Sequence, residues 1–354
     1  MKKNILIVGT GTIGEPLIGL LSDLKNELNI NVYFNKRTPL VDEVAKVESL
    51  IGRGAKLVTS PIRKKKFENI GHNVVCTYEK ALEKADVVID CTPAGNENKE
   101  LYYLPSTKFG DKKRTFIAQG SEKGFGIPYA YGINDEILNE KSDFIQVVSC
   151  NTHNIASILH SIDPNLSSIE KGDFVCIRRA NDISQEGNFI ASPKVGNHDS
   201  KKFGTHHAKD AYDLFRTKDK FVNIFSSALK VNSQYMHVIR FDLVVYGHVS
   251  KENLINRFRE NKFVALSHKT IANKVFSFGR DHGYYGRIFN QTVVSVPTLT
   301  VNSLPGKTKI SGFCFTPQDG NSLLSSIAAA LYGLHGDSYT NYLKIFDKFL
   351  FQDI

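Results

Sequence analysis

The chain has 354 residues, of which 41% are hydrophobic and 23% charged, a composition typical of a globular protein with one or two domains. The first residues, MKKNILIVGTGTIG, mimic a signal peptide, but glycines interrupt the apolar run too early for a signal sequence or a membrane span. The net charge of +9 is compatible with nucleic acid, an acidic surface or phosphorylated small molecules. The densest basic run, RKKK at 63–66, lacks interleaved aromatic residues for base stacking, so we expect a solvated face there and no nucleic-acid partner.

Five cysteines (Cys76, Cys91, Cys150, Cys176 and Cys314) are widely spaced along the chain. Their odd number and the lack of a signal sequence argue against a disulfide framework and for reduced thiols. No cysteine or histidine pattern has the spacing of a zinc site, so we expect no metal. These features predict a cytoplasmic protein with no membrane partner.

The first half of the chain alternates short apolar runs with segments of helical period. Strands are expected at 3–9, 31–37, 114–120 and 143–150, a helix at 13–28, and a helix that leads into a strand at 79–93. This alternation is typical of βαβ units. It predicts an N-terminal Rossmann domain with a doubly wound parallel sheet over residues 1–149.

Longer strand-like runs follow at 174–181, 234–249 and 290–301, with helices placed less regularly between them. They predict an α+β catalytic domain with a mainly antiparallel sheet over residues 150–316. Two late helices are expected at 322–334 and 338–351. Their apolar faces need cover, so we expect residues 317–354 to return to the Rossmann domain.

The run GTGTIG places Gly9, Gly11 and Gly14 in the G-x-G-x-x-G spacing, directly after an apolar strand and before a helix. Gly9 permits the tight turn, Gly11 lets the backbone approach a pyrophosphate, and Gly14 lets helix and strand pack closely. The N–H groups around Thr12 and Ile13 would hold the phosphate charge. The spacing indicates a dinucleotide site.

The end of the second expected strand indicates which dinucleotide is bound. Enzymes that prefer NAD usually carry a carboxylate here for the ribose hydroxyl, but this chain has Lys36, Arg37 and Thr38. Two cations and a hydroxyl suit a 2′-phosphate. NADP is therefore the preferred cofactor and NAD a possible one, unless the two cations are solvated loop charges.

Cys150 lies in the polar segment SCNTHN, at the end of one expected strand. A strand end that leads into a helix gives a cysteine partial exposure and backbone N–H donors, as a thiolate nucleophile requires. The other four cysteines lie inside apolar runs. Cys150 is therefore the candidate nucleophile, with one more buried thiol as the alternative.

Eight stretches resemble, in chain order, the motifs of one enzyme family, from residue 5 to about residue 325. VVSCNTH is similar to the family's SCNTT, GTGTIG to GYGTIG, NKRTP to SKTRP, DVVIDCTPAG to DIVIDCTPEG, and AQGSEK to FQGGEK. IRRAND is similar to VRRGAD, THHAKD to SHHGPD, and YMHVIRFDLVV to LMHQHNVMVEV. The chain thus resembles the archaeal-type (type II) phosphorylating glyceraldehyde-3-phosphate dehydrogenases.

The resemblance implies oxidation of D-glyceraldehyde 3-phosphate with NAD(P) and inorganic phosphate to 1,3-bisphosphoglycerate, in glycolysis or gluconeogenesis. Cys150 would attack the aldehyde, and phosphate would release the thioester. His237 matches the family's base, although on the residues alone a histidine in an apolar strand is more often part of the core. The resemblance also implies a homotetramer.

The resemblance extends to two further sets of residues. The substrate set is Ser149, Asn151, Thr152, Arg178, Arg179, His206 and His207. The cofactor set comprises the residues of the glycine-rich turn and of the segment after the second strand, together with five further positions. Its members are Gly9, Gly11, Thr12, Ile13, Gly14, Lys36, Arg37, Thr38, Thr92, Gly120, Arg179, Gln318 and Asn321. On the residues alone, the arginine pair could equally form a surface ion pair.

The chain departs from the family pattern at several positions. His153 replaces the second threonine of SCNTT, Ile239 replaces a histidine, and PQDG stands where the family has HQES. These changes leave open an aldehyde dehydrogenase similar to aspartate-semialdehyde dehydrogenase. A third alternative is an inactive dinucleotide-binding protein that binds nucleic acid through its basic surface.

Overall fold

The computed structural model describes residues 2–107, 113–120, 122–139, 143–181, 187, 189–317 and 319–354. Contacts divide the chain into two compact units. Unit 1 comprises residues 1–127, 138–147 and 325–345, and unit 2 comprises residues 128–137, 148–324 and 346–354. The functional domains expected at 1–149 with 317–354, and at 150–316, stay a prediction. Within the described ranges, no helix has both the length and the apolar character that a membrane crossing requires.

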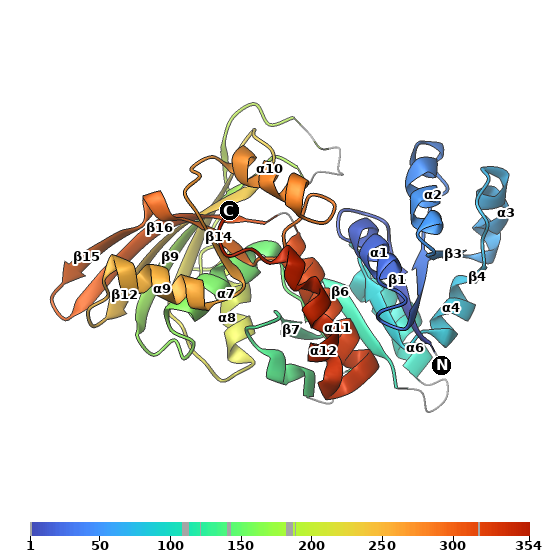
Figure 1. Cartoon of the computed structure of the whole chain (residues 1–354), viewed down its shortest axis with the longest axis horizontal. Helices are drawn as coiled ribbons and strands as arrows, with labels where there is room; N and C mark the ends of the chain where they lie inside the picture. The colour runs from blue at the N-terminus through green and yellow to red at the C-terminus, as the bar shows by residue number, and fades with distance from the viewer. Residues whose placement is uncertain are drawn as a thin grey trace. The chain divides into compact units, whose positions relative to one another are not determined.

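Seven strands of an eight-stranded sheet lie in unit 1, some of them labelled in Figure 1, and most of the last strand, β7, belongs to unit 2; the strand order is β4-β3-β2-β1-β5-β6-β8-β7. The strands are β1 (Lys3–Val8), β2 (Ile30–Asn35), β3 (Lys56–Thr59), β4 (Cys76–Thr77), β5 (Val87–Asp90), β6 (Thr115–Gln119), β7 (Ile127–Tyr129) and β8 (Phe144–Val147). From β4 to β8 every pair of neighbours is parallel. All residues of β5 and β6 are buried, as in a parallel sheet covered on both faces. The predicted doubly wound parallel sheet is confirmed.

The helices that follow the strands of unit 1 are mostly short. They are α1 (Gly14–Asp23), α2 (Val44–Gly52), α3 (Pro61–Asn69), α4 (Tyr78–Lys84), α5 (Gly95–Asn98), α6 (Leu104–Thr107) and α12 (Tyr339–Leu343). Helix α11 (Gly320–His335) agrees with the helix expected at 322–334. Helix α1 ends at Asp23 rather than at residue 28, because turns follow it and Asn29 takes a φ of 52° just before β2.

The direction of winding changes at β1, which lies between β2 and β5. The ends of these strands are joined by backbone hydrogen bonds, from Gly9 N–H to the Asn35 carbonyl (3.0 Å) and from Cys91 N–H to the Val8 carbonyl (2.8 Å). In open α/β sheets, ligands bind outside the carboxyl ends of the strands at such a switch point. The topology therefore places the glycine-rich turn where a dinucleotide site is expected.

Unit 2 contains a second eight-stranded sheet, ordered β10-β11-β9-β12-β16-β14-β13, with β15 paired to β16. Its strands are β9 (Ile169–Arg178), β10 (Lys194–Val195), β11 (Ile224–Lys230), β12 (His237–Tyr246), β13 (Val264–Ser267), β14 (Thr292–Ser295), β15 (Thr300–Leu304) and β16 (Lys307–Thr316). Five strand pairs are antiparallel, and only β9·β11 and β13·β14 are parallel. The predicted mainly antiparallel sheet is confirmed.

Two expected elements are wrong in detail. The strand at 290–301 divides into β14 and β15 at a 3₁₀ turn over Val296–Thr298, because Pro297 has no N–H to donate to a ladder. The terminal helix at 338–351 ends with α12 and continues as a 3₁₀ segment, Lys344–Phe349. Beyond it the chain pairs with β13, where Leu266 accepts from and donates to the last residues.

Four helices belong to unit 2: α7 (Cys150–Ile162), α8 (His206–Arg216), α9 (Lys251–Glu260) and α10 (Ala272–His282). Helix α7 contacts α8, α9 and strands β9, β14 and β16. Every residue of α7 except Cys150 and His160 is buried. The helix that begins at the candidate nucleophile is thus the central helix of this unit's core.

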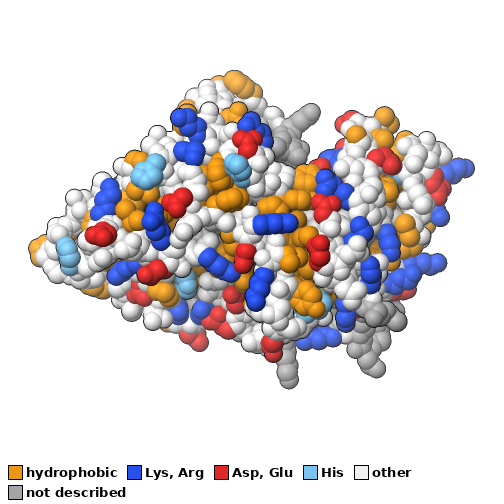
Figure 2. Space-filling model, in the orientation of Figure 1, with side chains coloured by type: hydrophobic (Ala, Val, Ile, Leu, Met, Phe, Trp, Pro, Cys, Tyr) orange, Lys and Arg blue, Asp and Glu red, His pale blue; other side chains and the backbone are white. Residues whose placement is uncertain are grey.

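The surface carries charges of both signs. On the face shown in Figure 2, lysine and arginine side chains lie among aspartate and glutamate side chains over much of the surface. The densest run becomes α3, where Lys64, Lys65 and Lys66 are exposed and Arg63 is half-buried. The expectation of a solvated face therefore holds for the three lysines but not for Arg63.

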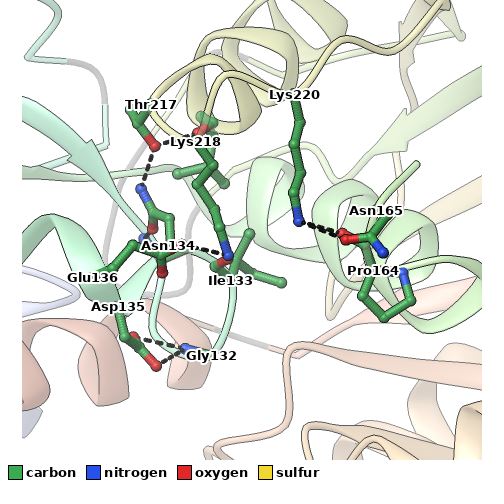
Figure 3. A network of polar contacts seen from close by, with 12 residues as sticks. Gly132, Ile133, Asn134, Asp135, Glu136, Pro164, Asn165, Thr217, Lys218 and Lys220 are labelled. Carbon is green, nitrogen blue, oxygen red and sulfur yellow. Dashed lines mark hydrogen bonds and ion pairs between the residues drawn. The ribbon is translucent and has the colours of Figure 1, made fainter. Parts of the chain in front are cut away.

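Asn134 ties together a loop of unit 2 (Figure 3). Its side chain is fully buried, accepts from Ala130 N–H (3.0 Å), and donates to the Pro128 carbonyl (2.8 Å) and to Thr217 Oγ1 (2.9 Å). Lys218 Nζ adds a hydrogen bond to the Ile133 carbonyl (3.0 Å). These contacts fix the loop to the end of α8.

We predict that Asn134→Ala destabilises the protein by about 2–4 kcal/mol, because it leaves buried backbone groups without partners. Urea unfolding followed by circular dichroism measures the change. Asn256→Ala, on the exposed face of α9, is the matched control and should stay within about 0.5 kcal/mol of the parent. Equal midpoints for the two variants would contradict the role assigned to Asn134.

Candidate functional site

The glycine-rich turn of unit 1 has the close backbone packing that its spacing predicts. Gly9 takes a φ of +95°, and a Cβ on Gly14 would lie 2.2 Å from the Gly9 carbonyl oxygen. A Cβ on Gly11 would meet no atom within 4 Å, so the backbone there is open to a ligand. Thr12 and Ile13 are half-buried and directly precede α1.

A buried carboxylate supports this turn from the end of β5. Asp90 is fully buried and accepts from Thr92 N–H (2.9 Å), Thr92 Oγ1 (2.6 Å), Asn98 Nδ2 (2.7 Å) and Tyr103 Oη (2.6 Å). The Thr92 methyl lies 2.9 Å from where a Cβ on Gly9 would stand. Sequence reasoning missed Asp90, because it lies in an apolar run that indicates only a strand.

A cavity of about 490 Å³ lies at the carboxyl ends of β1, β2 and β3, next to the glycine-rich turn. Thr92 and Arg37 line it, whereas Lys36 and Thr38 do not. Lys36 is only 6% exposed and forms an ion pair with Glu43, and Arg37 and Thr38 are exposed. Of the three residues expected to contact the cofactor at the end of β2, Lys36 is buried in an ion pair, Arg37 lines the cavity, and Thr38 is exposed outside it.

Gly120 follows β6 with a φ of +46° and hydrogen-bonds to residues of the neighbouring strand β8. Its N–H donates to the Val147 carbonyl (2.8 Å), and its carbonyl accepts from Gln146 Nε2 (3.1 Å). Another expected cofactor residue, Gln318, lies outside the described residues.

Cys150 is the first residue of α7. Ser149 is the N-cap, whose hydroxyl accepts from Thr152 N–H (3.3 Å) and contacts Thr152 Oγ1 (2.9 Å). Cys150 itself is half-buried. The unpaired N–H groups of a first helical turn favour negative charge, so this position suits a thiolate.

Three of the other cysteines are in environments that oppose ionisation. Burial raises the pKa of the Cys91 and Cys176 thiols well above the ordinary range, and it raises that of Cys314 to about 12. Cys176 and Cys314 are fully buried. They are core residues, as their apolar sequence contexts predict.

Hydrogen bonds connect the first turn of α7 to other elements of unit 2. The Cys150 carbonyl accepts from Asn321 Nδ2 (3.1 Å), which also donates to the Gln291 carbonyl (3.2 Å). The Asn151 side-chain oxygen accepts from Thr316 Oγ1 (3.1 Å), and Thr316 is paired with His237 in the β12·β16 ladder. The ladder therefore brings the start of β12 close to the start of α7.

His237 is 7% exposed, and its Nδ1 accepts from Arg179 N–H (3.1 Å). Because Nδ1 accepts this bond it carries no proton, and the neutral ring therefore holds its proton on Nε2. Burial, followed by the charges of Arg179 and Arg178 and by His207, lowers the pKa of His237 well below its ordinary value. The imidazole is neutral at pH 7 and can donate a hydrogen bond from Nε2.

The arginine pair and the histidine pair lie in this electrostatic neighbourhood. Arg179 is 4% exposed, donates to the Tyr235 carbonyl (3.4 Å) and lies 3.9 Å from an Asp319 carboxylate oxygen, whereas Arg178 is exposed. His206 and His207 begin α8 with ring centroids 4.0 Å apart, the first exposed and the second buried. Arg178, Arg179 and His207 thus lie close enough to His237 to influence its charge, and His206 lies beside His207.

His153, the departure from the family motif, is fully buried within α7. Its Nδ1 lies 3.0 Å from the Ser149 carbonyl oxygen. Burial, only partly offset by backbone hydrogen bonds, lowers its pKa to about 4. In the described part of the chain, no three His, Cys, Asp or Glu side chains gather in a way that could hold a metal.

No protein-family model matches the chain, but comparison with individual proteins identifies its family. The glyceraldehyde-3-phosphate dehydrogenase of Methanobacterium formicicum is 32% identical over 275 residues, 75% of this chain and 74% of that protein. The chain belongs to the archaeal-type glyceraldehyde-3-phosphate dehydrogenase family. Proteins of the same name from Sulfolobus acidocaldarius and Methanocaldococcus jannaschii are 28% and 26% identical, and each match covers 84–86% of both chains.

We predict that acid destabilises this member of the glyceraldehyde-3-phosphate dehydrogenase family partly through His153. In the unfolded chain this side chain takes up a proton near pH 6.5, whereas in the folded protein it does so only near pH 4. Unfolding at a pH between these two values therefore takes up a proton. The free energy of unfolding should therefore fall by up to about 1.4 kcal/mol per pH unit through this residue. His153→Thr should reduce the slope of stability against pH between pH 6.5 and 4.5, measured by urea unfolding.

The same two proteins at pH 8 provide the control, because the imidazole is neutral there in both states. Any difference at pH 8 reports only the change in packing. Parallel stability curves for the parent and His153→Thr from pH 8 to 4.5 would show that His153 titrates alike in both states.

Proposed function

We propose that the chain is a phosphorylating glyceraldehyde-3-phosphate dehydrogenase that prefers NADP and can use NAD. It oxidises D-glyceraldehyde 3-phosphate in the presence of inorganic phosphate to 1,3-bisphosphoglycerate. The observation that carries the proposal is Cys150, half-buried at the first turn of α7 and linked through Asn151 and Thr316 to the strand that begins with His237. The relatives named glyceraldehyde-3-phosphate dehydrogenase support the aldehyde substrate.

The residues of unit 1 fit a nicotinamide dinucleotide. A Cβ on Gly14 would clash with the Gly9 carbonyl and one on Gly9 with the Thr92 methyl, while the backbone at Gly11 is open, as an approaching pyrophosphate needs. Gly9, Gly11, Thr12, Ile13 and Gly14 would hold the pyrophosphate, and Thr92 and Arg37 would contact the adenosine half. When bound, the nicotinamide ring supplies the acceptor for the aldehyde hydride. Gly120, Gln318 and Asn321 stay proposed contacts.

Cys150 is the proposed nucleophile. Its thiolate forms a C–S bond to the aldehyde carbon, and the carbonyl oxygen takes up the negative charge. After oxidation the cysteine carries a thioester. An oxygen of inorganic phosphate attacks this thioester, which expels the thiolate and leaves an acyl phosphate. The positive end of helix α7 favours negative charge at this position.

His237 is proposed to act from Nε2. The hydrogen bond that Nδ1 accepts from Arg179 leaves the proton on Nε2, which suits donation to the oxygen that becomes negative when the thiolate attacks. A thiolate that has already lost its proton needs no base in this step. The donor role therefore accounts for the proton on Nε2 better than does the role of base that the family resemblance implies.

The substrate's anionic groups need cations. Arg178 and His206 are exposed beside the buried Arg179 and His207, and we propose that this group binds the phosphates of substrate and co-substrate, with Ser149 at the aldehyde. We also propose a cytoplasmic homotetramer, which analytical ultracentrifugation would test.

The first test of the proposed function is the initial rate of NADP reduction with glyceraldehyde 3-phosphate and phosphate. We expect a rate that requires phosphate and falls by at least about 10³-fold in Cys150→Ser, because a hydroxyl is a far weaker nucleophile than a thiolate.

NAD in place of NADP, and aspartate semialdehyde in place of glyceraldehyde 3-phosphate, are the comparison reactions. Cys76→Ser is the matched cysteine variant and should keep the parent rate. Faster turnover of aspartate semialdehyde, or a rate that Cys150→Ser retains, would refute the proposed reaction.

A second test separates the two roles of His237. If Nε2 donates a hydrogen bond, His237→Gln should keep roughly ten times more kcat than His237→Ala, because the glutamine amide also donates. If His237 only donates, any increase of kcat with pH in the parent enzyme should remain in His237→Gln. Equal losses of kcat in the two variants, together with an increase of kcat with pH that the parent shows and His237→Gln lacks, would identify His237 as the base.

A further inference from the structure

The cavity of about 490 Å³ in unit 1 is lined by residues of different chemistry. Leu101 and Tyr102 line it and are 59% and 40% exposed although large and hydrophobic. Two glutamates also line it, Glu79 from α4 and Glu97 from α5. Arg37, Thr59, Ser60 and Arg63 form a cationic wall, since they lie at or just after the ends of the neighbouring strands β2 and β3. A flat apolar ring and an anion can therefore bind side by side in this cavity.

Lys36, the lysine expected to carry the selective charge, is already neutralised. Its Nζ contacts the Glu43 carboxylate and lies 3.4 Å from Thr10 Oγ1. Burial on its own raises the pKa of Glu43, but hydrogen bonds from Lys36 and Lys46 outweigh it and the pKa is lowered. Glu43 is therefore ionised at neutral pH. Because Lys46 also lies 3.8 Å from Glu15, two lysines and two glutamates balance within this cluster.

Arg63 is directed toward the cavity by helix α3. It lies four residues before Phe67, which is fully buried, so both side chains are on the helix face that packs on the unit. The three lysines that follow Arg63 point to solvent. One guanidinium nitrogen donates to the Arg37 backbone carbonyl (2.7 Å), which holds the two arginines together.

The two arginines share the cavity with two carboxylates, Glu79 and Glu97, but pair directly with neither of them. Among the residues that the structure describes, neither Arg37 nor Arg63 forms an ion pair with a carboxylate. Ser60 is the N-cap of α3, yet its hydroxyl accepts no capping hydrogen bond from that helix. Two guanidinium groups and a free capping hydroxyl on one wall suit a phosphate dianion.

We propose that Arg63, together with Arg37 and Ser60, binds the 2′-phosphate of NADP and that Arg63 is the residue that selects NADP over NAD. This inference rests on the proposed function, in which the cavity holds the adenosine half of the cofactor. The charge that distinguishes NADP from NAD thus belongs to Arg63 in α3, and Lys36 instead stabilises the fold through its ion pair with Glu43.

Calorimetric titration with 2′,5′-ADP and 5′-AMP tests the inference without turnover, because these probes differ only in the 2′-phosphate. Arg63→Gln should raise the Kd of 2′,5′-ADP roughly 10- to 100-fold, the worth of a charge-assisted hydrogen-bond pair, and that of 5′-AMP less than about threefold. Arg63→Lys, which keeps the charge but loses the forked geometry, should give an intermediate Kd.

Lys65→Gln is the matched control, since it removes the same charge from an exposed position of the same helix. It should change both dissociation constants by less than about twofold. Equal losses for both probes in Arg63→Gln, or no loss for 2′,5′-ADP, would overturn the inference.

The parent protein separates this inference from the proposed function. If the parent binds both probes equally, the NADP preference fails and the inference fails with it. If the parent prefers 2′,5′-ADP and Arg63→Gln keeps that preference, only the role of Arg63 fails. A selective loss in Arg63→Gln supports the inference even if glyceraldehyde 3-phosphate is not turned over.

Discussion

The first N–H groups of a helix have no partner within the helix, and this constraint shapes every part of the candidate site. Helix α1 begins directly after the glycine-rich turn, α7 begins at Cys150, and α8 begins at His206. Helix α3 begins one residue after Ser60, at the cationic wall of the cavity. Each of these helix starts places the positive end of a helix where the proposed chemistry has an anion: a pyrophosphate, a thiolate, a substrate phosphate and a 2′-phosphate.

Local sequence patterns were sufficient for those parts of the molecule that depend on few residues. The spacing of Gly9, Gly11 and Gly14 predicts the turn, because only glycine permits a carbonyl as close as the one that faces Gly14. The apolar alternation predicts both sheets. The apolar sequence context predicts burial correctly for Cys176 and Cys314 but not for Cys76 and Cys91, which are half-buried like Cys150.

Other features depend on contacts between distant residues, which no local pattern encodes. The pairing of Lys36 with Glu43 needs the loop between them to fold back, and the His237 hydrogen bond joins two strands. The apolar run that ends at Asp90 predicts only a strand, because the four donors that its carboxylate accepts from belong to later residues. For Arg63 a signal did exist, since it lies four residues before an apolar Phe67, but a run of four cations indicates solvent exposure more strongly.

The Lys36–Glu43 pair also bears on how cofactor choice can change within a lineage. A carboxylate already lies near the glycine-rich turn, through the contact of its lysine with Thr10. Replacement of this lysine alone would leave Glu43 paired with Lys46, so it would not supply the free carboxylate that NAD-preferring proteins carry. A change of cofactor along a lineage therefore takes at least two substitutions, one that frees Glu43 from its lysines and one that removes Arg63.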